Sequence, residues 1–109
     1  MNLFELPETL PADELVERIA TGESVLVERI VSTGQVTPPG AWLEQERDEW
    51  VALVQGAAEL SFADGDRMAL EAGDHVLIAA GSRHRVERTS SEPPCIWLAV
   101  HAGSLAADR

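Results

Sequence analysis

The clearest structural signal in this chain is the stretch Gly73-Asp74-His75-Val76-Leu77-Ile78-Ala79-Ala80-Gly81-Ser82-Arg83-His84. It places a glycine turn, an apolar strand, a second tight turn and then a histidine at fixed offsets. A matching unit lies upstream between Gly40 and Gly56, and Glu49 lies inside it. We expect the two units to be the halves of a small β-barrel that brings Glu49 and His84 toward one interior site.

The composition indicates one globular domain and excludes several functions. The 109 residues suffice for one hydrophobic core but not for two. A net charge of −11 argues against binding to nucleic acid or to an anionic membrane, because phosphate contacts need a basic face. Lysine and tyrosine are absent, which excludes Schiff-base chemistry and a tyrosine acid. No apolar run approaches the ~20 residues of a membrane span. The N-terminus lacks a signal-peptide pattern, so we expect a cytoplasmic protein.

Glycine, proline and aspartate divide the chain into one helix and a series of short strands. Residues 11–20 predict a helix, since Pro11 suits a first helical turn and acidic residues follow it. The later apolar runs predict strands at 24–32, 41–45, 49–55, 57–62, 67–70, 75–79, 84–89 and 96–101, with Asp64-Gly65 as a hairpin turn. Such spacing is typical of a sandwich or barrel. We expect a single all-β domain, with an N-terminal segment at 1–23, the barrel at 24–101 and a loosely held tail at 102–109.

The first unit resembles the first motif of the cupin superfamily, whose members fold as a double-stranded β-helix, or jelly-roll, barrel. That motif has glycine, five residues, His-x-His, three or four residues, glutamate, six residues and glycine. Gly40, Glu49 and Gly56 match it here. The resemblance therefore implies a cupin barrel preceded by one short helix.

The second unit resembles the second cupin motif, Gly-x5-Pro-x-Gly-x2-His-x3-Asn. Gly73, Gly81 and His84 match it, whereas Ala79 stands at the proline position and Arg88 at the asparagine position. The likeness extends over roughly residues 25–101 and is greatest to small bacterial single-domain cupins.

The histidine pair of the first motif is the main departure. If three residues precede Glu49, the two positions hold Leu43 and Gln45; if four precede it, they hold Trp42 and Glu44. Neither alignment supplies an imidazole. The resemblance implies a ligand role for Glu49 and for one of Gln45 and Glu44.

A second histidine reaches the same site by another argument. If residues 90–94 form a hairpin turn, His101 lies across from His84 on the neighbouring strand. Two histidines and a carboxylate suit Fe(II), and related sets suit Mn, Ni or Zn. The sequence thus predicts a divalent-metal site built by His84, His101 and Glu49, with Gln45 or Glu44 as a further ligand.

The ligand and the reaction are expected from the residues around this site. Arg83 and Arg85 flank His84 and are expected to hold an anionic small molecule at the barrel mouth. An oxygenase, isomerase or lyase step is compatible with a bound metal, and Glu49 or Glu44 would be the general base. The alternative is a metal-free small-molecule-binding or sensory barrel without catalytic activity, which the missing histidine pair favours. We also expect a homodimer, since a barrel this small gains core by pairing.

Overall fold

The computed structural model describes residues 1–106, and within them the chain forms strands joined by loops, with no helix that could cross a membrane. In chain order the strands are β1 (Leu15–Thr21), β2 (Val25–Ser32), β3 (Asp48–Gln55), β4 (Ala57–Phe62), β5 (Arg67–Glu71), β6 (His75–Ile78), β7 (His84–Thr89) and β8 (Cys95–Ala102). The expected all-β fold is confirmed.

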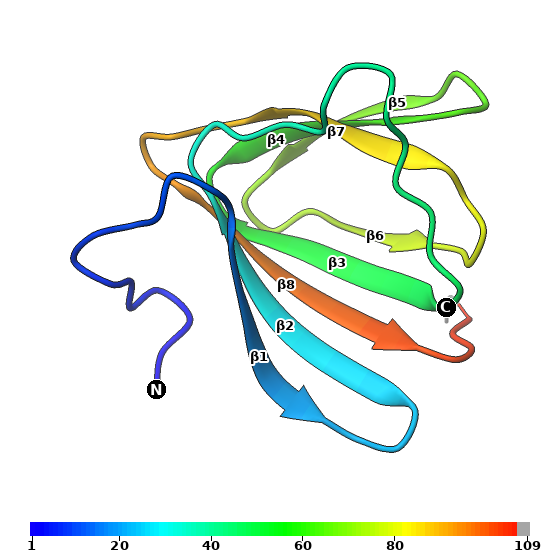
Figure 1. Cartoon of the computed structure of the whole chain (residues 1–109), viewed down its shortest axis with the longest axis horizontal. Helices are drawn as coiled ribbons and strands as arrows, with labels where there is room; N and C mark the ends of the chain where they lie inside the picture. The colour runs from blue at the N-terminus through cyan, green and yellow to red at the C-terminus, as the bar shows by residue number, and fades with distance from the viewer. Residues whose placement is uncertain (107–109) are drawn as a thin grey trace.

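Two antiparallel sheets face each other and enclose the interior (Figure 1). The larger sheet has the order β1-β2-β8-β3-β6, and the smaller has the order β5-β4-β7. Their inner faces meet in a core that includes Leu53, Leu60, Leu70, Cys95 and Trp97. Burial of each large apolar side chain is worth about 1.5–3 kcal/mol, so these inner faces hold the two sheets together.

The helix expected at 11–20 is wrong, because residues 15–21 form strand β1. This strand pairs with β2 from Leu15↔Val31 to Thr21↔Leu26. The apolar side chains at 15, 16 and 19 have helical spacing, but a segment this short is not a stable helix by itself. Strand β2 offers an unpaired edge, and pairing to that edge satisfies the peptide groups of β1. Tertiary pairing therefore overrides the local helical pattern.

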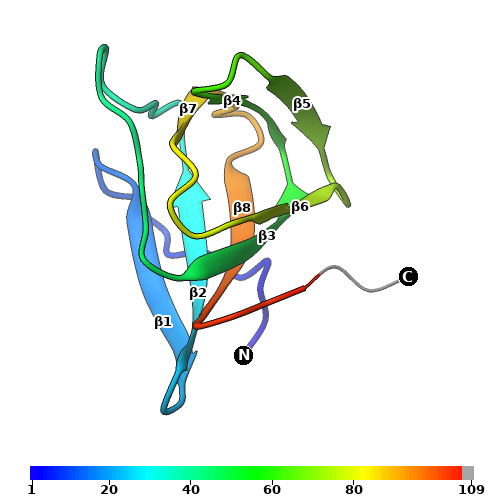
Figure 2. The same ribbon diagram turned by 90° about the vertical axis from the view of Figure 1, so that its right-hand side faces the viewer.

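The strand expected at 41–45 is also wrong, because these residues belong to a long loop between β2 and β3. A β-bridge joins Leu43 to His84, with Leu43 N–H donating to His84 O at 2.7 Å and His84 N–H to Leu43 O at 3.0 Å. Pro38 and Pro39 precede this bridge and lack the backbone donors that a longer ladder needs. Figure 2 shows the loop running along the side of the barrel to the start of β3.

The remaining expected strands and the Asp64-Gly65 hairpin turn between β4 and β5 are confirmed, but one pairing is not. Strand β7 pairs with β4 in the smaller sheet, whereas β8 lies between β2 and β3 in the larger one. The segment after β7 carries the chain from one sheet to the other. His84 and His101 therefore lie on facing walls of the barrel, not across from each other on neighbouring strands.

The expected C-terminal tail is held in part. Strand β8 continues to Ala102, and Leu105 N–H donates to Asp48 Oδ2 at 2.7 Å. This contact and the one from Ala80 N–H to Asp48 Oδ1 lower the pKa of Asp48, because both stabilise its charged form. The last residues of the expected tail, 107–109, lie outside the described residues.

Candidate functional site

A cavity of about 180 Å³ lies between the two sheets. Its apolar walls are formed by Val16, Ile30, Leu43, Val51, Leu60, Ile78, Val86 and Trp97. Its polar lining residues are Glu14, Glu28, Gln45, Glu49, His84 and His101. An apolar cavity with a few convergent polar groups has the usual character of a small-molecule site.

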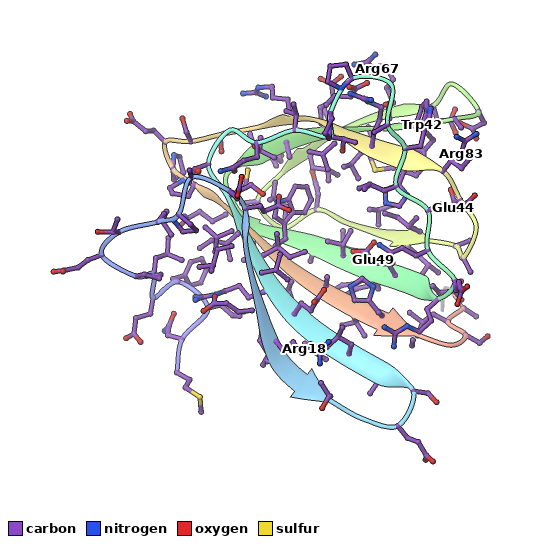
Figure 3. The ribbon with its side chains drawn as sticks, in the orientation of Figure 1. Arg18, Trp42, Glu44, Glu49, Arg67 and Arg83 are labelled. Carbon is purple, nitrogen blue, oxygen red and sulfur yellow. The ribbon has the colours of Figure 1, made fainter. Side chains whose placement is uncertain are left out.

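Strand register places Glu49 and His101 side by side on the inner face of the larger sheet. Glu49 of β3 pairs with His101 of β8, which in turn pairs with Leu26 of β2. Paired residues of antiparallel strands point to the same face, and Glu28 shares that face because it lies two residues after Leu26. Glu49 is 7% exposed and His101 is 9% exposed. Figure 3 shows Glu49 between the two sheets.

Four side chains form a hydrogen-bonded chain along this polar wall. Gln45 donates its Nε2–H to Glu49 Oε1 at 3.2 Å, which leaves Gln45 Oε1 to accept from His101 Nδ1 at 3.0 Å. His101 Nε2 lies 2.9 Å from Glu28 Oε1, and an ionised carboxylate only accepts. Both ring nitrogens of His101 are therefore engaged, Nε2 by Glu28 and Nδ1 by Gln45. Gln45 in turn fixes the position of the Glu49 carboxylate.

His84 lies on the facing wall, at the start of β7, and is 4% exposed. Its Nδ1 lies 2.9 Å from the backbone O of Ser82. A carbonyl oxygen only accepts, so Nδ1 carries a proton, and in the neutral form of the ring Nε2 is the acceptor. The turn before β7 therefore determines the tautomer of His84.

The environment of Glu49 opposes its ionisation in part. Burial raises the pKa of its carboxyl, because desolvation disfavours the charged form. His101, His84 and the hydrogen bond from Gln45 act against that rise. Within residues 1–106, Glu49 Oε2 makes no hydrogen bond, and His101 Nε2 lies 4.0 Å from it. This oxygen is available to a ligand in the cavity.

The loop before β3 shows which side chains take the two histidine positions. Leu43 and Gln45 line the cavity, whereas Trp42 and Glu44 are exposed and do not line it. In Figure 3 Glu44 and Trp42 lie on the outer side of this loop, away from Glu49. The structure thus brings Gln45 to Glu49, and it leaves Glu44 outside the site.

The two arginines expected at the barrel mouth do not line the cavity. Arg83 is exposed, and its guanidinium carbon lies 5.9 Å from the centroid of the Trp42 ring (Figure 3). Arg85 donates to the backbone oxygens of three loop residues at 2.9–3.1 Å, namely Thr37, Pro38 and Ala41. Its Nε–H donates to Glu87 Oε1 at 2.9 Å. Arg85 therefore fastens the loop that carries Leu43 and Gln45.

Glu28 is the site residue that sequence reasoning missed. Its side chain is 16% exposed and lies on the inner face of β2, between Leu26 and Ile30. An acid at an alternate position of an otherwise apolar strand face is rarely buried without a partner. The position of Glu28 on that strand face could therefore have indicated a buried acid with a polar partner, and the structure shows that this partner is His101.

The cavity opens toward solvent on one side and is closed by polar side chains on another. Val16 and Leu43 line it and are 52% and 41% exposed, and a surface hollow of about 480 Å³ begins there. A second hollow, of about 400 Å³, borders Glu28, Gln45 and His101. The hydrogen-bonded chain separates this second hollow from the interior.

The donor set does not form a complete metal site. Among residues 1–106, no group of three or more histidine, cysteine, aspartate and glutamate side chains is placed to hold a metal ion. Leu43 has no donor atom, and His101 uses both nitrogens in hydrogen bonds to Glu28 and Gln45. No buried polar side-chain atom in this part of the chain lacks a partner. Gln45 and His101 are thus already engaged, and a metal held by either would have to break these hydrogen bonds.

Comparison with known proteins identifies likenesses over most of the chain. A family model described as "Cupin domain" matches residues 27–101. A Ralstonia eutropha protein, provisionally named a mannose-6-phosphate isomerase, is 35% identical, with a TM-score of 0.89 over 95% of this chain and 97% of its own. In a search of curated proteins, none matches.

Two further solved structures share the fold at lower identity. A cupin superfamily protein of Desulfitobacterium hafniense is 17% identical, with a TM-score of 0.74 over 90% of this chain and 84% of its own. A DMSP lyase of Ruegeria pomeroyi is 19% identical, with a TM-score of 0.71 over 91% of this chain and 53% of its own. At these identities the likeness concerns the fold alone.

Proposed function

This chain belongs to the cupin family, and on that premise we propose that its interior cavity binds a small organic ligand between Glu49 and His84. The observation that carries the proposal is the convergence of two free acceptors, Glu49 Oε2 and His84 Nε2, in one partly apolar cavity. They come from facing sheets, so a molecule that enters between the sheets meets both.

The two acceptors also suit proton transfer. A ligand with an acidic C–H or O–H bond would give its proton to Glu49, the general base, or to His84 Nε2. Because burial raises the pKa of Glu49, its carboxylate is a stronger base than an exposed one. Gln45 would hold that carboxylate in position throughout. Isomerase and lyase steps use such transfers, and isomerisation is the reaction type in the name of the Ralstonia protein, which is 35% identical.

A sugar phosphate suits this cavity poorly, despite the name given to the Ralstonia protein. Phosphate recognition relies on arginine or lysine side chains. No arginine among residues 1–106 lines the cavity, and Arg85 is already bound to backbone oxygens. The proposed ligand is therefore not a phosphate ester.

The proposal is tested by nuclear magnetic resonance with a neutral probe, isoamyl alcohol. Trp97 lines the cavity and donates its indole N–H to Ser32 Oγ at 3.2 Å, so its indole resonance reports on the cavity. Trp50 does not line the cavity and lies against His75, so it serves as the internal control. We expect saturable shifts at Trp97 and none at Trp50. Equal small shifts at both indoles would contradict the proposal.

A divalent metal is the second candidate occupant, and one observation favours it. A metal-bound histidine usually donates its other ring N–H to a carbonyl or carboxylate, as His84 does toward Ser82. His84 and Glu49 would hold such an ion, with Gln45 or His101 joining only after their hydrogen bonds break. Because an amide is a weak ligand, the ion would be held loosely.

Metal analysis and thermal unfolding test this second candidate. Protein purified without chelator would contain Zn, Fe, Mn or Ni, and the content would fall in His84→Ala but not in His75→Ala. His75 is an exposed residue of β6, so its variant controls for loss of an imidazole. Unchanged melting temperature on addition of all four metals would argue for the metal-free pocket. A cytoplasmic location, a homodimer and the absence of nucleic-acid and membrane partners stay predictions.

A further inference from the structure

We infer that the ligand of this cavity is a small protonated amine with a branched or cyclic apolar body, its ammonium group lying between Glu49 and His84. The inference rests on the proposed function and adds the chemical class of the ligand. It departs from the anionic ligand that Arg83 and Arg85 suggest in the sequence.

The charge of the lining residues favours a cation. Three carboxylates, Glu14, Glu28 and Glu49, line the cavity, and no arginine among residues 1–106 does. His101 Nε2 lies 2.9 Å from Glu28 Oε1, so the Glu28 carboxylate already has a hydrogen-bond partner. Glu49 has an amide donor on Oε1, whereas the nearest basic nitrogen to its Oε2, His101 Nε2, is 4.0 Å away. A buried carboxylate in this state is stabilised by a positive ligand and destabilised further by a negative one.

The hydrogen-bonding atoms that face the cavity point to the same class. Glu49 Oε2 is an acceptor, and so is Nε2 of the neutral His84 ring, because the Ser82 carbonyl holds the proton of that tautomer on Nδ1. A carboxylate ligand has no donor for either atom. An ammonium group has three donors and no acceptor, so it satisfies both without leaving an unmatched lone pair.

The remaining walls set the size and polarity of the rest of the ligand. The cavity of about 180 Å³ equals the volume of roughly six water molecules, so the part of the ligand inside it is small. Its deep wall is formed by apolar side chains such as Val51, Leu60 and Trp97. The open side passes between Val16 and Leu43, which are also apolar. A short branched or cyclic hydrocarbon body fits this lining better than a polyol does.

The test compares three molecules of nearly equal shape, isoamylamine, isoamyl alcohol and isovalerate, at pH 7 in the presence of EDTA. Dissociation constants are measured from the Trp97 indole resonance, with Trp50 as the internal control. We expect the amine to bind about ten-fold more tightly than the alcohol, since a hydrogen bond to a charged group is roughly twice as strong as a neutral one. Isovalerate is expected to bind more weakly than either.

Two variants with the same change of net charge locate the effect. Glu49→Gln is expected to remove the advantage of the amine over the alcohol, whereas Glu23→Gln, in the exposed turn between β1 and β2, is expected to retain it. If Glu49→Gln does not fold, the three-ligand comparison on the natural chain decides by itself. Isovalerate or the alcohol binding as tightly as the amine would overturn this inference and leave the proposed function standing. No shift of Trp97 with any of the three would overturn both.

Discussion

Removal of the Arg85 side chain should destabilise the fold, because this arginine fastens the loop that closes the cavity. Its guanidinium donates to the backbone oxygens of Thr37, Pro38 and Ala41, and its side chain is only 14% exposed. With about 0.5–1.5 kcal/mol per net hydrogen bond, loss of all three lowers the free energy of unfolding by about 1.5–4.5 kcal/mol. At an m-value of about 1.5 kcal/mol/M, the urea midpoint of Arg85→Ala should fall by about 1–3 M.

The matched control is Arg83→Ala, because Arg83 is exposed and its guanidinium carbon lies 5.9 Å from the centroid of the Trp42 ring, much as that of Arg85 lies 6.0 Å from it. Its stability should change by no more than about 0.5 kcal/mol. Arg85→Lys should recover little stability, because an ammonium group cannot span three carbonyl oxygens as the guanidinium does. Amide exchange at Leu43 and Gln45 should accelerate in Arg85→Ala. The reasoning fails if Arg85→Ala unfolds at the urea concentration of the natural chain, or if Arg83→Ala is equally destabilised.

Three further predictions concern stability. The pKa of Glu49 is raised in the folded state, so the protonated carboxyl stabilises the fold. This stabilisation is fully present below the ordinary pKa of a carboxyl group, and it is lost as the pH rises through the raised pKa of the folded state. Glu49→Gln in EDTA should therefore gain stability over the natural chain as pH rises from 4 to 8, and a pH-independent difference in urea unfolding would refute this. Gly56→Ala should lower the free energy of unfolding by about 2–5 kcal/mol, because Gly56 has a φ of 94° and an added Cβ would lie 2.7 Å from Ser90 Oγ. Gly65→Ala, at φ 103° with nothing within 4 Å, should cost only about 1–2 kcal/mol in the same denaturation, and equal costs would contradict the steric reasoning. Asp48→Ala should speed amide exchange at Leu105, which Asp48 Oδ2 holds; unchanged exchange would show that another contact holds it.

Much of the candidate site could be predicted, because its residues occupy the positions that the two cupin motifs assign to ligands. Glu49 and His84 both line the cavity, and Gln45 takes one of the two histidine positions. The alternative pair, Trp42 and Glu44, could not be excluded from sequence, since either of two adjacent residues in a loop can face inward. The bridge between Leu43 and His84 resolves that choice, because it places one side of the loop against the interior.

Other parts of the site could not be predicted because they depend on pairings between distant segments. Glu28 joins the site only because β2 lies beside β8, where His101 meets its carboxylate. His101 was expected beside His84, yet it lies beside Glu49, since β8 enters the other sheet. Arg85 follows the motif residue His84 directly and was therefore expected to bind a ligand. In the structure its guanidinium instead donates hydrogen bonds to three backbone oxygens of the neighbouring loop.

The all-β class, most strand positions and the family can be inferred from the sequence, because alternation, turn glycines and motif spacing are local properties of the chain. The pairing of residues 15–21 as a strand, and the set of acids and imidazoles that line the cavity, depend on the tertiary structure. These outcomes depend on which sheet edge is free and which wall a side chain reaches. Only the packed barrel fixes those relations, because they are contacts between segments that lie far apart in the sequence.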